Sequence, residues 1–277
     1  MSNYYFHHSG GLGDIMWPYF HQYHHQLVKL KEKEPNSIVT YLCCSDNKQV
    51  TQFYKNNPMV NKIFQFTMSD YHKGTWKKQI PGKVCLDEKY PIQNAKPAKE
   101  FWLDKMEQDY ADYVLSLGKY VAIHPFGGTK QRTMSRNDFS LKKLVDIFID
   151  LEYNVVILGG NSDLRKENLQ RFEHDNARCI NLLDRFSCRL HAFLTAHADA
   201  FVGISSCYSV VAAAFGINSL IYYPLSLKWW AEGTPPQVGI DGFSQAFRDN
   251  NNIAEYFEQP SDTTDGLIKR FLSRKLT

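Results

Sequence analysis

The sequence predicts an α/β protein built from two parallel sheets, one in each of two domains. Strand and helix patterns alternate along both halves of the chain, and the second half repeats a strand followed by a helix four times before a last strand that ends at Pro224. Neighbouring parallel strands require such helical crossovers. The 277 residues are also enough for two hydrophobic cores.

We therefore divide the chain into three parts. We expect residues 1–118 to form an N-terminal domain and residues 119–248 to form a second, doubly wound domain. Residues 249–277 carry a weaker helical pattern, and we expect a helical segment that packs back toward the N-terminal domain. The two parallel sheets are expected to face each other across a cleft.

Composition points to a globular protein, with 43% hydrophobic and 14% aromatic residues. The chain has no apolar run long enough for a transmembrane segment, and its first residues lack the pattern of a signal peptide, so we expect a cytoplasmic protein. The six cysteines show no C-x-x-C spacing. They show no paired metal pattern either, so we expect reduced thiols and no cysteine metal site.

The chain opens with a strand pattern over residues 4–7, a glycine-rich turn over residues 8–14 and then a helix pattern. Gly11 and Gly13 allow the backbone of this turn to approach a ligand closely. Asp14 ends the turn, and a carboxylate at the end of a parallel strand can act as a general base. The alternative is that Asp14 only caps the following helix.

Three histidines, His21, His24 and His25, lie on that helix at the spacing i, i+3 and i+4. This spacing could form a metal-binding face. No carboxylate or cysteine lies at matching spacing, so we interpret the three as solvated or stacking side chains.

Two more strand patterns follow, over residues 37–44 and 60–66, with a helix between them. A helix over residues 100–116 then leads to the expected domain boundary at Gly118. Small parallel sheets are built from this alternation.

Between residues 68 and 100 the alternation stops, and lysines are interleaved with Tyr71, Trp76 and Tyr90. Residues 29–99 hold 13 lysines against 6 acidic residues. Basic side chains interleaved with aromatic rings suit phosphates and stacked rings, so we expect a phosphate-rich acceptor at residues 71–99. The alternative is an ordinary lysine-rich, solvated surface.

The second domain begins with a strand at Tyr120, VAIHPFGG, and a loop that contains Gly127, Lys130 and Arg132. Cations after a strand and a small-residue loop suit a phosphorylated group. The strand VVILGG then ends at Gly160, where the turn is a further candidate for ligand contact. Helix patterns cover residues 141–151, 164–173 and 189–196, the last capped by Ser187, and a short strand covers residues 179–182.

Residues 198–224 form a strand, helix and strand unit around which we expect an anion-binding site. A strand over residues 200–203 is followed by the turn Ser205, Ser206 and Cys207 and by a helix over residues 209–215. Gly216 can take the left-handed conformation that ends a helix, so the chain can return as a strand over residues 219–223. Backbone N–H groups and hydroxyls at this helix N-terminus, with Ser209 in its first turn, suit an anion. The alternative is an ordinary packing unit with a polar turn.

Three segments carry a resemblance to a known family: GGLGDIMWP, VAIHPFGGTKQRTMSRNDF with VVILGGNSD behind it, and FVGISSCYSVVAAAFGINSLIYYP. In their order and spacing the chain resembles glycosyltransferase family 9, which contains the lipopolysaccharide heptosyltransferases. The resemblance implies two Rossmann-like domains in the GT-B arrangement, with an acceptor-binding domain over residues 1–118 and a nucleotide-sugar (donor) domain over residues 119–248. The implied reaction is an inverting, metal-independent transfer from the nucleotide-sugar, without a cofactor. The resemblance also implies that Asp14 is the base, that Lys130 and Arg132 bind the donor phosphates, and that Ser205, Ser206 and Ser209 cradle the diphosphate.

The chain departs from the family at Ser205, where an aspartate is common, and at Val210, where a histidine is common. For the acceptor we keep two hypotheses: a bacterial lipopolysaccharide or surface glycan, and a hydroxymethylated pyrimidine in phage-type DNA, which would make the enzyme one of DNA modification. Two other classes stay open. A nucleotide-sugar epimerase would use Asp14 and His124 in the cleft, and a non-catalytic sugar-nucleotide binding protein would use Asp14 only as a cap.

Overall fold

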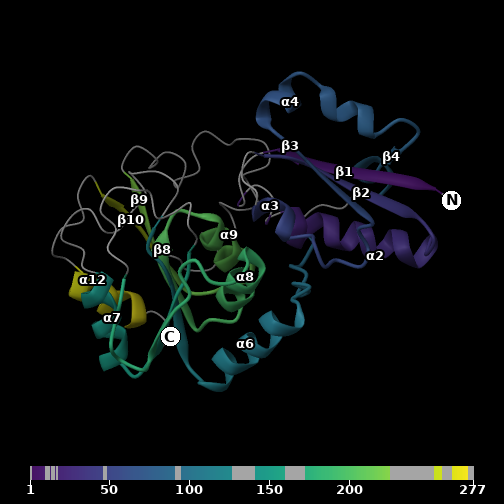
Figure 1. Cartoon of the computed structure of the whole chain (residues 1–277). Coiled ribbons are helices and arrows are strands. Elements are labelled where there is room, and N and C mark those ends of the chain that lie inside the picture. The colour runs from purple at the N-terminus through teal and green to yellow at the C-terminus, as the bar shows by residue number, and fades with distance from the viewer. Residues whose placement is uncertain are drawn as a thin grey trace. The chain divides into compact units, whose positions relative to one another are not determined.

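The computed structural model describes residues 2–9, 13, 16, 18–45, 49–90, 95–126, 141–159, 172–224, 253–257 and 264–273. The chain divides into two compact units, Met1–Lys105 with Ser187–Arg189 and Met106–Phe186 with Leu190–Thr277. Each unit contains its own parallel sheet (Figure 1). The predicted α/β fold class with two parallel sheets is confirmed.

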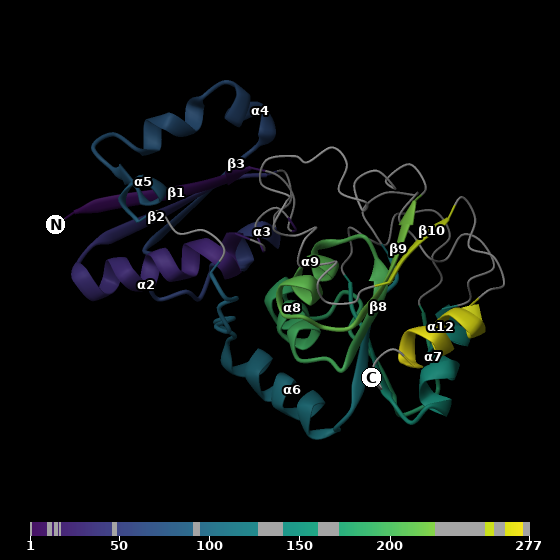
Figure 2. The same ribbon diagram turned by 180° about the vertical axis from the view of Figure 1, so that it is seen from behind.

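The sheet of the first unit has the order β3-β2-β1-β4, and its three long strands pair in parallel. Its strands are β1 (Asn3–Ser9), β2 (Ile38–Cys44), β3 (Lys62–Phe66) and β4 (Val84–Cys85). The π-helical turn η1 (Tyr19–Tyr23) continues into α2 (His24–Lys33), and α3 (Gln49–Gln52) precedes β3. α2 and α4 (Met68–His72) lie on opposite sides of this sheet in both views (Figure 2).

Aromatic rings fill the core of the first unit. Phe6 of β1 stacks on Tyr23 and Tyr41 with ring centroids 4.8 and 4.9 Å apart. Tyr19 packs edge-on against Phe53 at 4.8 Å. Offset and edge-on contacts of this kind add to the apolar area that the rings bury. The rings bury η1 and the start of α2 against the sheet.

Residues 68–90 are more regular than the sequence predicts. They form α4, the 3-10 helix η2 (Thr75–Gln79), the short strand β4 and α5 (Leu86–Lys89). Thr67 caps α4: its Oγ1 accepts from the backbone N–H of Asp70 at 3.1 Å, and its own N–H donates to the Asp70 carboxylate at 3.2 Å. Because β4 has two residues, it is too short to show strand periodicity.

The sheet of the second unit has the order β10-β9-β8-β5-β6-β7, and all its pairs are parallel. Its strands are β5 (Tyr120–His124), β6 (Asn154–Ile157), β7 (Cys179–Asn181), β8 (Ala200–Ile204), β9 (Ser219–Pro224) and β10 (Ile253–Phe257). In chain order this is the 3-2-1-4-5-6 arrangement of the Rossmann fold. The direction in which strands are added reverses between β5 and β8.

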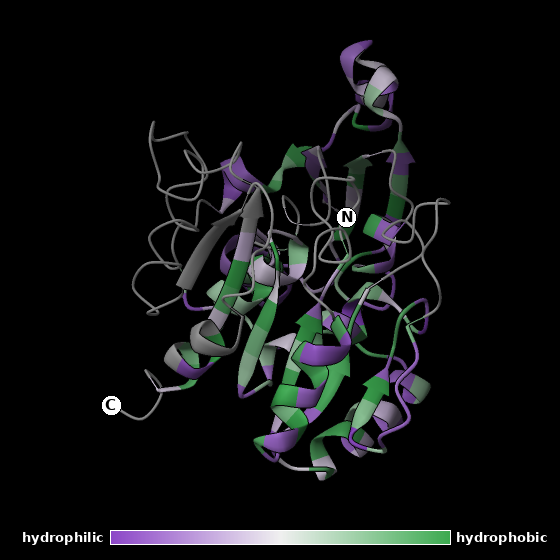
Figure 3. Ribbon diagram, turned by 90° about the vertical axis from the view of Figure 1, so that its left-hand side faces the viewer, coloured by the Kyte–Doolittle hydropathy of each residue, from purple (hydrophilic) through white to green (hydrophobic). Residues whose placement is uncertain are grey.

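Helices cover both faces of this second sheet. α7 (Leu141–Asp150) and α12 (Thr264–Ser273) pack on one face, where Phe148, Ile268 and Phe271 join the buried strand residues in one core. α8 (Cys188–Ala196) and α9 (Cys207–Ala214) lie on the other side of the sheet (Figure 1). Strands buried on both faces read as continuous apolar runs. Where Figure 3 colours the strands of this sheet, they are accordingly mostly green, which marks hydrophobic residues.

The division of the chain differs from the predicted one in two respects. The first unit ends at Lys105, so α6 (Lys105–Ser116) lies almost wholly in the second unit rather than in the first. The prediction of a helical segment over residues 249–277 is wrong for Ile253–Phe257, which form β10 beside β9. Ile268 and Phe271 of α12 lie in the core of the second unit, so α12 packs within that unit.

Predicted helix ends are confirmed at two places. Gly216 has φ 68°, and the bonds from Gly216 N–H to Ala213 O (3.2 Å) and from Ile217 N–H to Ala212 O (2.9 Å) close α9 in a Schellman motif. Ser187 Oγ accepts from the N–H of Arg189 at 3.2 Å at the start of α8.

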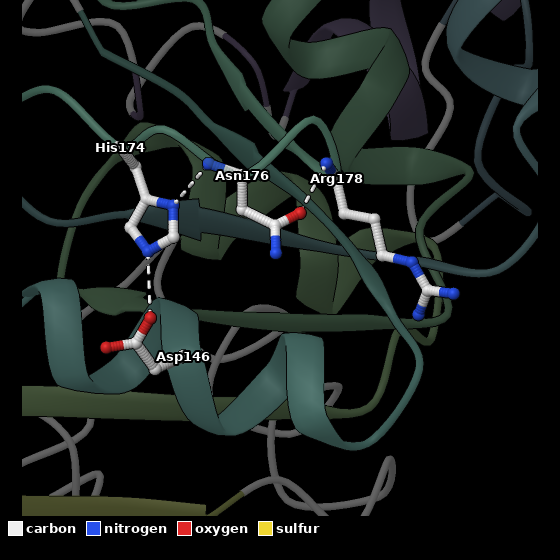
Figure 4. Close-up of polar contacts among 4 residues, drawn as sticks. All are labelled: Asp146, His174, Asn176 and Arg178. Carbon is white, nitrogen blue, oxygen red and sulfur yellow. Dashed lines mark hydrogen bonds and ion pairs between the residues drawn. The ribbon is translucent and has the colours of Figure 1, made fainter.

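The connection into β7 is held to α7 by a polar chain (Figure 4). Nε2 of His174 lies 2.8 Å from Oδ1 of Asp146 in α7, and Nδ1 of His174 accepts from Asn176 N–H at 3.2 Å. Asn176 Oδ1 then accepts from Arg178 N–H at 2.9 Å, directly before β7. Since Nδ1 accepts, the proton lies on Nε2, which donates to Asp146. This chain lies at the amino end of β7, away from the edge where α/β proteins bind ligands.

No disulfide links the six cysteines, all of which lie in the described ranges. Burial raises the pKa of the Cys43, Cys44 and Cys179 thiols to about 11. Within the described ranges, no helix has the length and apolar character that crossing a membrane requires.

Candidate functional site

The reversal of strand order between β5 and β8 defines the candidate site of the second unit. Open parallel sheets bind ligands outside the carboxyl ends of their strands at such a reversal. β5 ends at His124, which pairs with Gly203 of β8, and β8 ends at Ile204. The serine turn and the N-terminus of α9 come directly after β8, as the sequence predicted.

His124 and Ser206 meet at this edge. Nδ1 of His124 lies 2.8 Å from Oγ of Ser206, although the two residues are 82 positions apart. His124 is only 2% exposed, while Ser206 is half-buried at the N-cap of α9. The arrangement therefore holds a hydroxyl at the start of a helix, where the helix dipole and the first N–H groups favour an anion.

Two more of the predicted donor-site residues flank Ser206. Ser205 is buried, and its N–H donates to Tyr222 O in β9 at 3.1 Å, which ties the turn to the sheet. Cys207 is the first residue of α9 and is half-buried. The structure thus brings Ser205, Ser206 and Cys207 together at one strand end.

Ser209 has a different role from the predicted one. Its hydroxyl accepts from Ser206 N–H at 3.1 Å and donates to Ser206 O at 2.7 Å, and the residue is 1% exposed. A side chain of the third helical residue that bonds back to the N-cap belongs to the helix cap. We therefore assign Ser209 to the cap of α9 and not to ligand binding.

Tyr208 packs against His124, and His191 packs in turn against Tyr208; the sequence analysis singled out neither. The ring of Tyr208 meets the His124 ring edge-on, with centroids 4.8 Å apart. The Tyr208 hydroxyl lies 3.3 Å from Nδ1 of His191 in α8. Tyr208 follows the serine turn directly in the sequence. That position was the signal that could have indicated it.

The candidate site of the first unit lies at the carboxyl end of β1. The strand continues to Ser9, so His8 lies in it beside His7 and does not belong to the turn. Burial lowers the pKa of His8 to about 3, with a further contribution from nearby His7, and burial also lowers the pKa of His7. Two neutral imidazoles thus precede the glycine-rich turn, a pair that the sequence analysis passed over.

Among the remaining predicted site residues, Gly13 is helical and half-buried. Gly11, Asp14, Gly127, Lys130, Arg132 and Gly160 lie outside the described residues.

The three helical histidines bind a neighbouring stretch of chain. His21 Nδ1 lies 2.7 Å from Ala95 O, His25 Nε2 lies 2.8 Å from Lys96 O, and His24 Nε2 lies 3.2 Å from the Glu100 carboxylate. They therefore fasten residues 95–100 to η1 and α2. Among the described residues, no three His, Cys, Asp or Glu side chains are grouped so that they could share a metal ion.

The stretch 71–99 separates into buried rings and exposed lysines. Trp76 is 8% exposed and stacks on His7 and Tyr71, with centroids 4.9 and 5.9 Å apart, and Tyr90 is 9% exposed. These rings pack within the unit and present no open stacking platform. The exposed lysines of the stretch are Lys73, Lys77, Lys78, Lys89, Lys96 and Lys99.

Comparison with known proteins supports the fold. No family model matches the chain, and no curated protein matches it. Solved structures do match: a glycosyl transferase family 9 protein from Veillonella parvula DSM 2008 has a TM-score of 0.56 at 13% identity, over 97% of this chain and 91% of that one. The fold is that of family 9 glycosyltransferases.

Two Escherichia coli structures agree with this. The heptosyltransferase WaaC, solved with ADP, has a TM-score of 0.55 at 11% identity over 99% of both chains. The ADP-heptose lipopolysaccharide heptosyltransferase II has a TM-score of 0.51 at 14% identity, over 99% of this chain and 100% of that one. At these identities the likeness concerns the fold, which the resemblance in sequence had predicted.

Proposed function

We propose that this protein is a glycosyltransferase whose second unit binds a nucleotide-sugar donor. The observation that carries the proposal is the site at the carboxyl ends of β5 and β8, where His124 holds the Ser206 hydroxyl at the N-terminus of α9. A helix N-terminus at the reversal point of a Rossmann sheet is suited to a diphosphate. That WaaC, with the same fold, is solved with ADP supports this use.

In the proposed reaction, an acceptor hydroxyl attacks the anomeric carbon as the bond to the nucleoside diphosphate breaks. Asp14 takes the hydroxyl proton as general base, and Lys130 and Arg132 neutralise the departing diphosphate. A single displacement of this kind inverts the anomeric centre. Fixed cations and helix N–H groups stabilise the leaving group, so the proposal includes no metal.

For the acceptor, we propose a phosphate-bearing glycan of the lipopolysaccharide core type. The exposed lysines of residues 71–99 support contacts with phosphates, which attract Lys side chains at long range. The buried Trp76 and Tyr90 lend no support to stacking on an exposed base, so modified DNA becomes the alternative outcome of the test.

The test offers radiolabelled ADP-, UDP- and GDP-sugars together with either lipid-core glycan or hydroxymethylated duplex DNA. We expect label to enter the glycan with an inverted anomeric centre, before and after treatment with EDTA. The Asp14→Asn variant should lose at least about a hundredfold in rate and still bind the nucleoside diphosphate. The control Asp112→Asn, an exposed carboxylate of α6, should transfer as the wild type does.

Each contrary result refutes a different part. Unchanged transfer by Asp14→Asn refutes the base, and label in the DNA alone refutes the glycan acceptor. Conversion of the donor sugar without transfer indicates an epimerase. Diphosphate binding without any chemistry indicates a non-catalytic binding protein, and the absence of binding refutes the donor site.

A further inference from the structure

We infer that His124 is a positioning residue that orients the Ser206 hydroxyl as a hydrogen-bond donor toward the diphosphate. This inference rests on the proposed function, because it concerns the same donor site. It adds a residue that acts on the ligand only through another side chain.

The first step is that His124 has one available orientation. It is the last residue of β5, paired with Gly203 of β8, and it is 2% exposed. The edge-on ring of Tyr208, at a centroid distance of 4.8 Å, packs against it. A buried side chain packed against an aromatic ring keeps its rotamer, so Nδ1 is directed at Ser206 in a constant geometry.

The second step concerns the proton between the two side chains. If the Ser206 hydroxyl donates its proton to an unprotonated Nδ1, only the lone pairs of its oxygen are left for a ligand. A phosphate oxygen needs a hydrogen-bond donor, so it gains no hydrogen bond from this arrangement. If Nδ1–H donates to Ser206 Oγ, the hydroxyl proton is left for a phosphate oxygen. A bound diphosphate therefore selects the form of His124 that is protonated on Nδ1.

The third step is that the neighbouring serines do not duplicate this role. Both hydrogen bonds of the Ser209 hydroxyl are made within the helix cap, and Ser205 is buried with its N–H on Tyr222 O. Ser206 is half-buried and lies at the N-cap, where a hydroxyl can contact an anion. The histidine thus acts on the half-buried serine of the turn, the more exposed of Ser205 and Ser206.

The experiment uses the full chain and measures the affinity of ADP, UDP, GDP and CDP, with the matching nucleosides measured by competition. Four variants are compared: His124→Leu, His124→Asn, Ser206→Ala and the double variant His124→Leu with Ser206→Ala. Asparagine places an amide N–H near the position of Nδ1, whereas leucine keeps about the volume of the side chain and has no hydrogen-bond donor. His174→Leu is the matched control, since it removes a buried, hydrogen-bonded histidine of the same unit from the amino end of the sheet.

We expect His124→Leu and Ser206→Ala each to weaken the diphosphate that the wild type binds about tenfold, and to leave the nucleoside unchanged. His124→Asn should stay within about threefold of the wild type. The double variant should be no weaker than either single variant, because the histidine acts through the serine.

Three results would overturn the inference: full diphosphate affinity in His124→Leu, equal losses for nucleoside and diphosphate, or additive losses in the double variant. If His124→Leu does not fold, His124→Gln takes its place, since its amide lies one bond further out and cannot replace Nδ1. A wild type that binds none of the four diphosphates refutes the proposed function itself, and the inference with it.

Discussion

Substituting Gly203 with alanine tests how closely β8 approaches β5 beside the donor site. A Cβ at this position would lie 2.7 Å from Cζ and 3.0 Å from Cε1 of Phe201, and 3.0 Å from the backbone O of His124. Carbon atoms in contact prefer about 3.5 to 4.0 Å. The Phe201 ring is fully buried, so it has no solvent into which it can turn.

We expect Gly203→Ala to cost about 2 kcal/mol, within the range of overpacked cores. Amide exchange followed by mass spectrometry measures this locally, because a loss of about 2 kcal/mol speeds exchange through global opening about 30-fold. The peptides to follow cover β5 and β8. Peptides of β1 and β2, from the other unit, serve as an internal reference that should not change.

The Phe201→Leu variant identifies the cause. It removes the ring atoms that meet the new Cβ, so Gly203→Ala should cost less than about 1 kcal/mol in that background. Exchange within threefold of the wild type in Gly203→Ala would refute the reasoning, and so would an equal cost with and without the ring.

Two further predictions concern single groups. The pKa of His8 is lowered to about 3 by burial, whereas an unfolded histidine binds a proton below about 6.5, so the first unit loses stability as the pH falls from 6.5 toward 3. Urea titrations at pH 7 and pH 5 measure the free energy of unfolding of the first unit. Between these two pH values His8→Asn should lose about 2 kcal/mol less of it than the wild type does. An equal loss in both proteins would contradict the lowered pKa of His8. Gly216→Ala should lower the free energy of unfolding of the second unit by about 1 kcal/mol because its φ is 68°, and Gly216→Asn should lose less; equal thermal midpoints for all three proteins would exclude strain at this position.

Local chemistry made much of the fold predictable. The strand, turn, helix and strand order of residues 198–224 appears almost as predicted, because Gly216 and the serine turn supply the backbone conformations that this order needs. β4 and β10 escaped prediction for a physical reason. β4 is two residues long, and β10 pairs with β9 at the edge of the sheet, so neither carries enough periodicity to be distinguished from its surroundings.

The fate of the polar and aromatic side chains was harder to predict. Lysines interleaved with Tyr71, Trp76 and Tyr90 read as one binding surface, but the chain folds Trp76 onto His7 and buries Tyr90, while most of the lysines stay exposed. An aromatic ring suits a core and a ligand platform equally well. Which of the two it joins depends on the side chains that the neighbouring sheet presents to it, here His7 of β1 for Trp76.

The sequence by itself determined the alternation of strands and helices, the helix caps and the placement of small polar residues after a strand of each unit, since these depend on a few neighbouring residues. Only the tertiary structure decided that His124 meets Ser206 and that the buried Ser209 hydroxyl bonds back to Ser206. Those outcomes depend on the order in which strands enter the sheet, because β8 must insert beside β5 before side chains 82 positions apart come within 2.8 Å of each other.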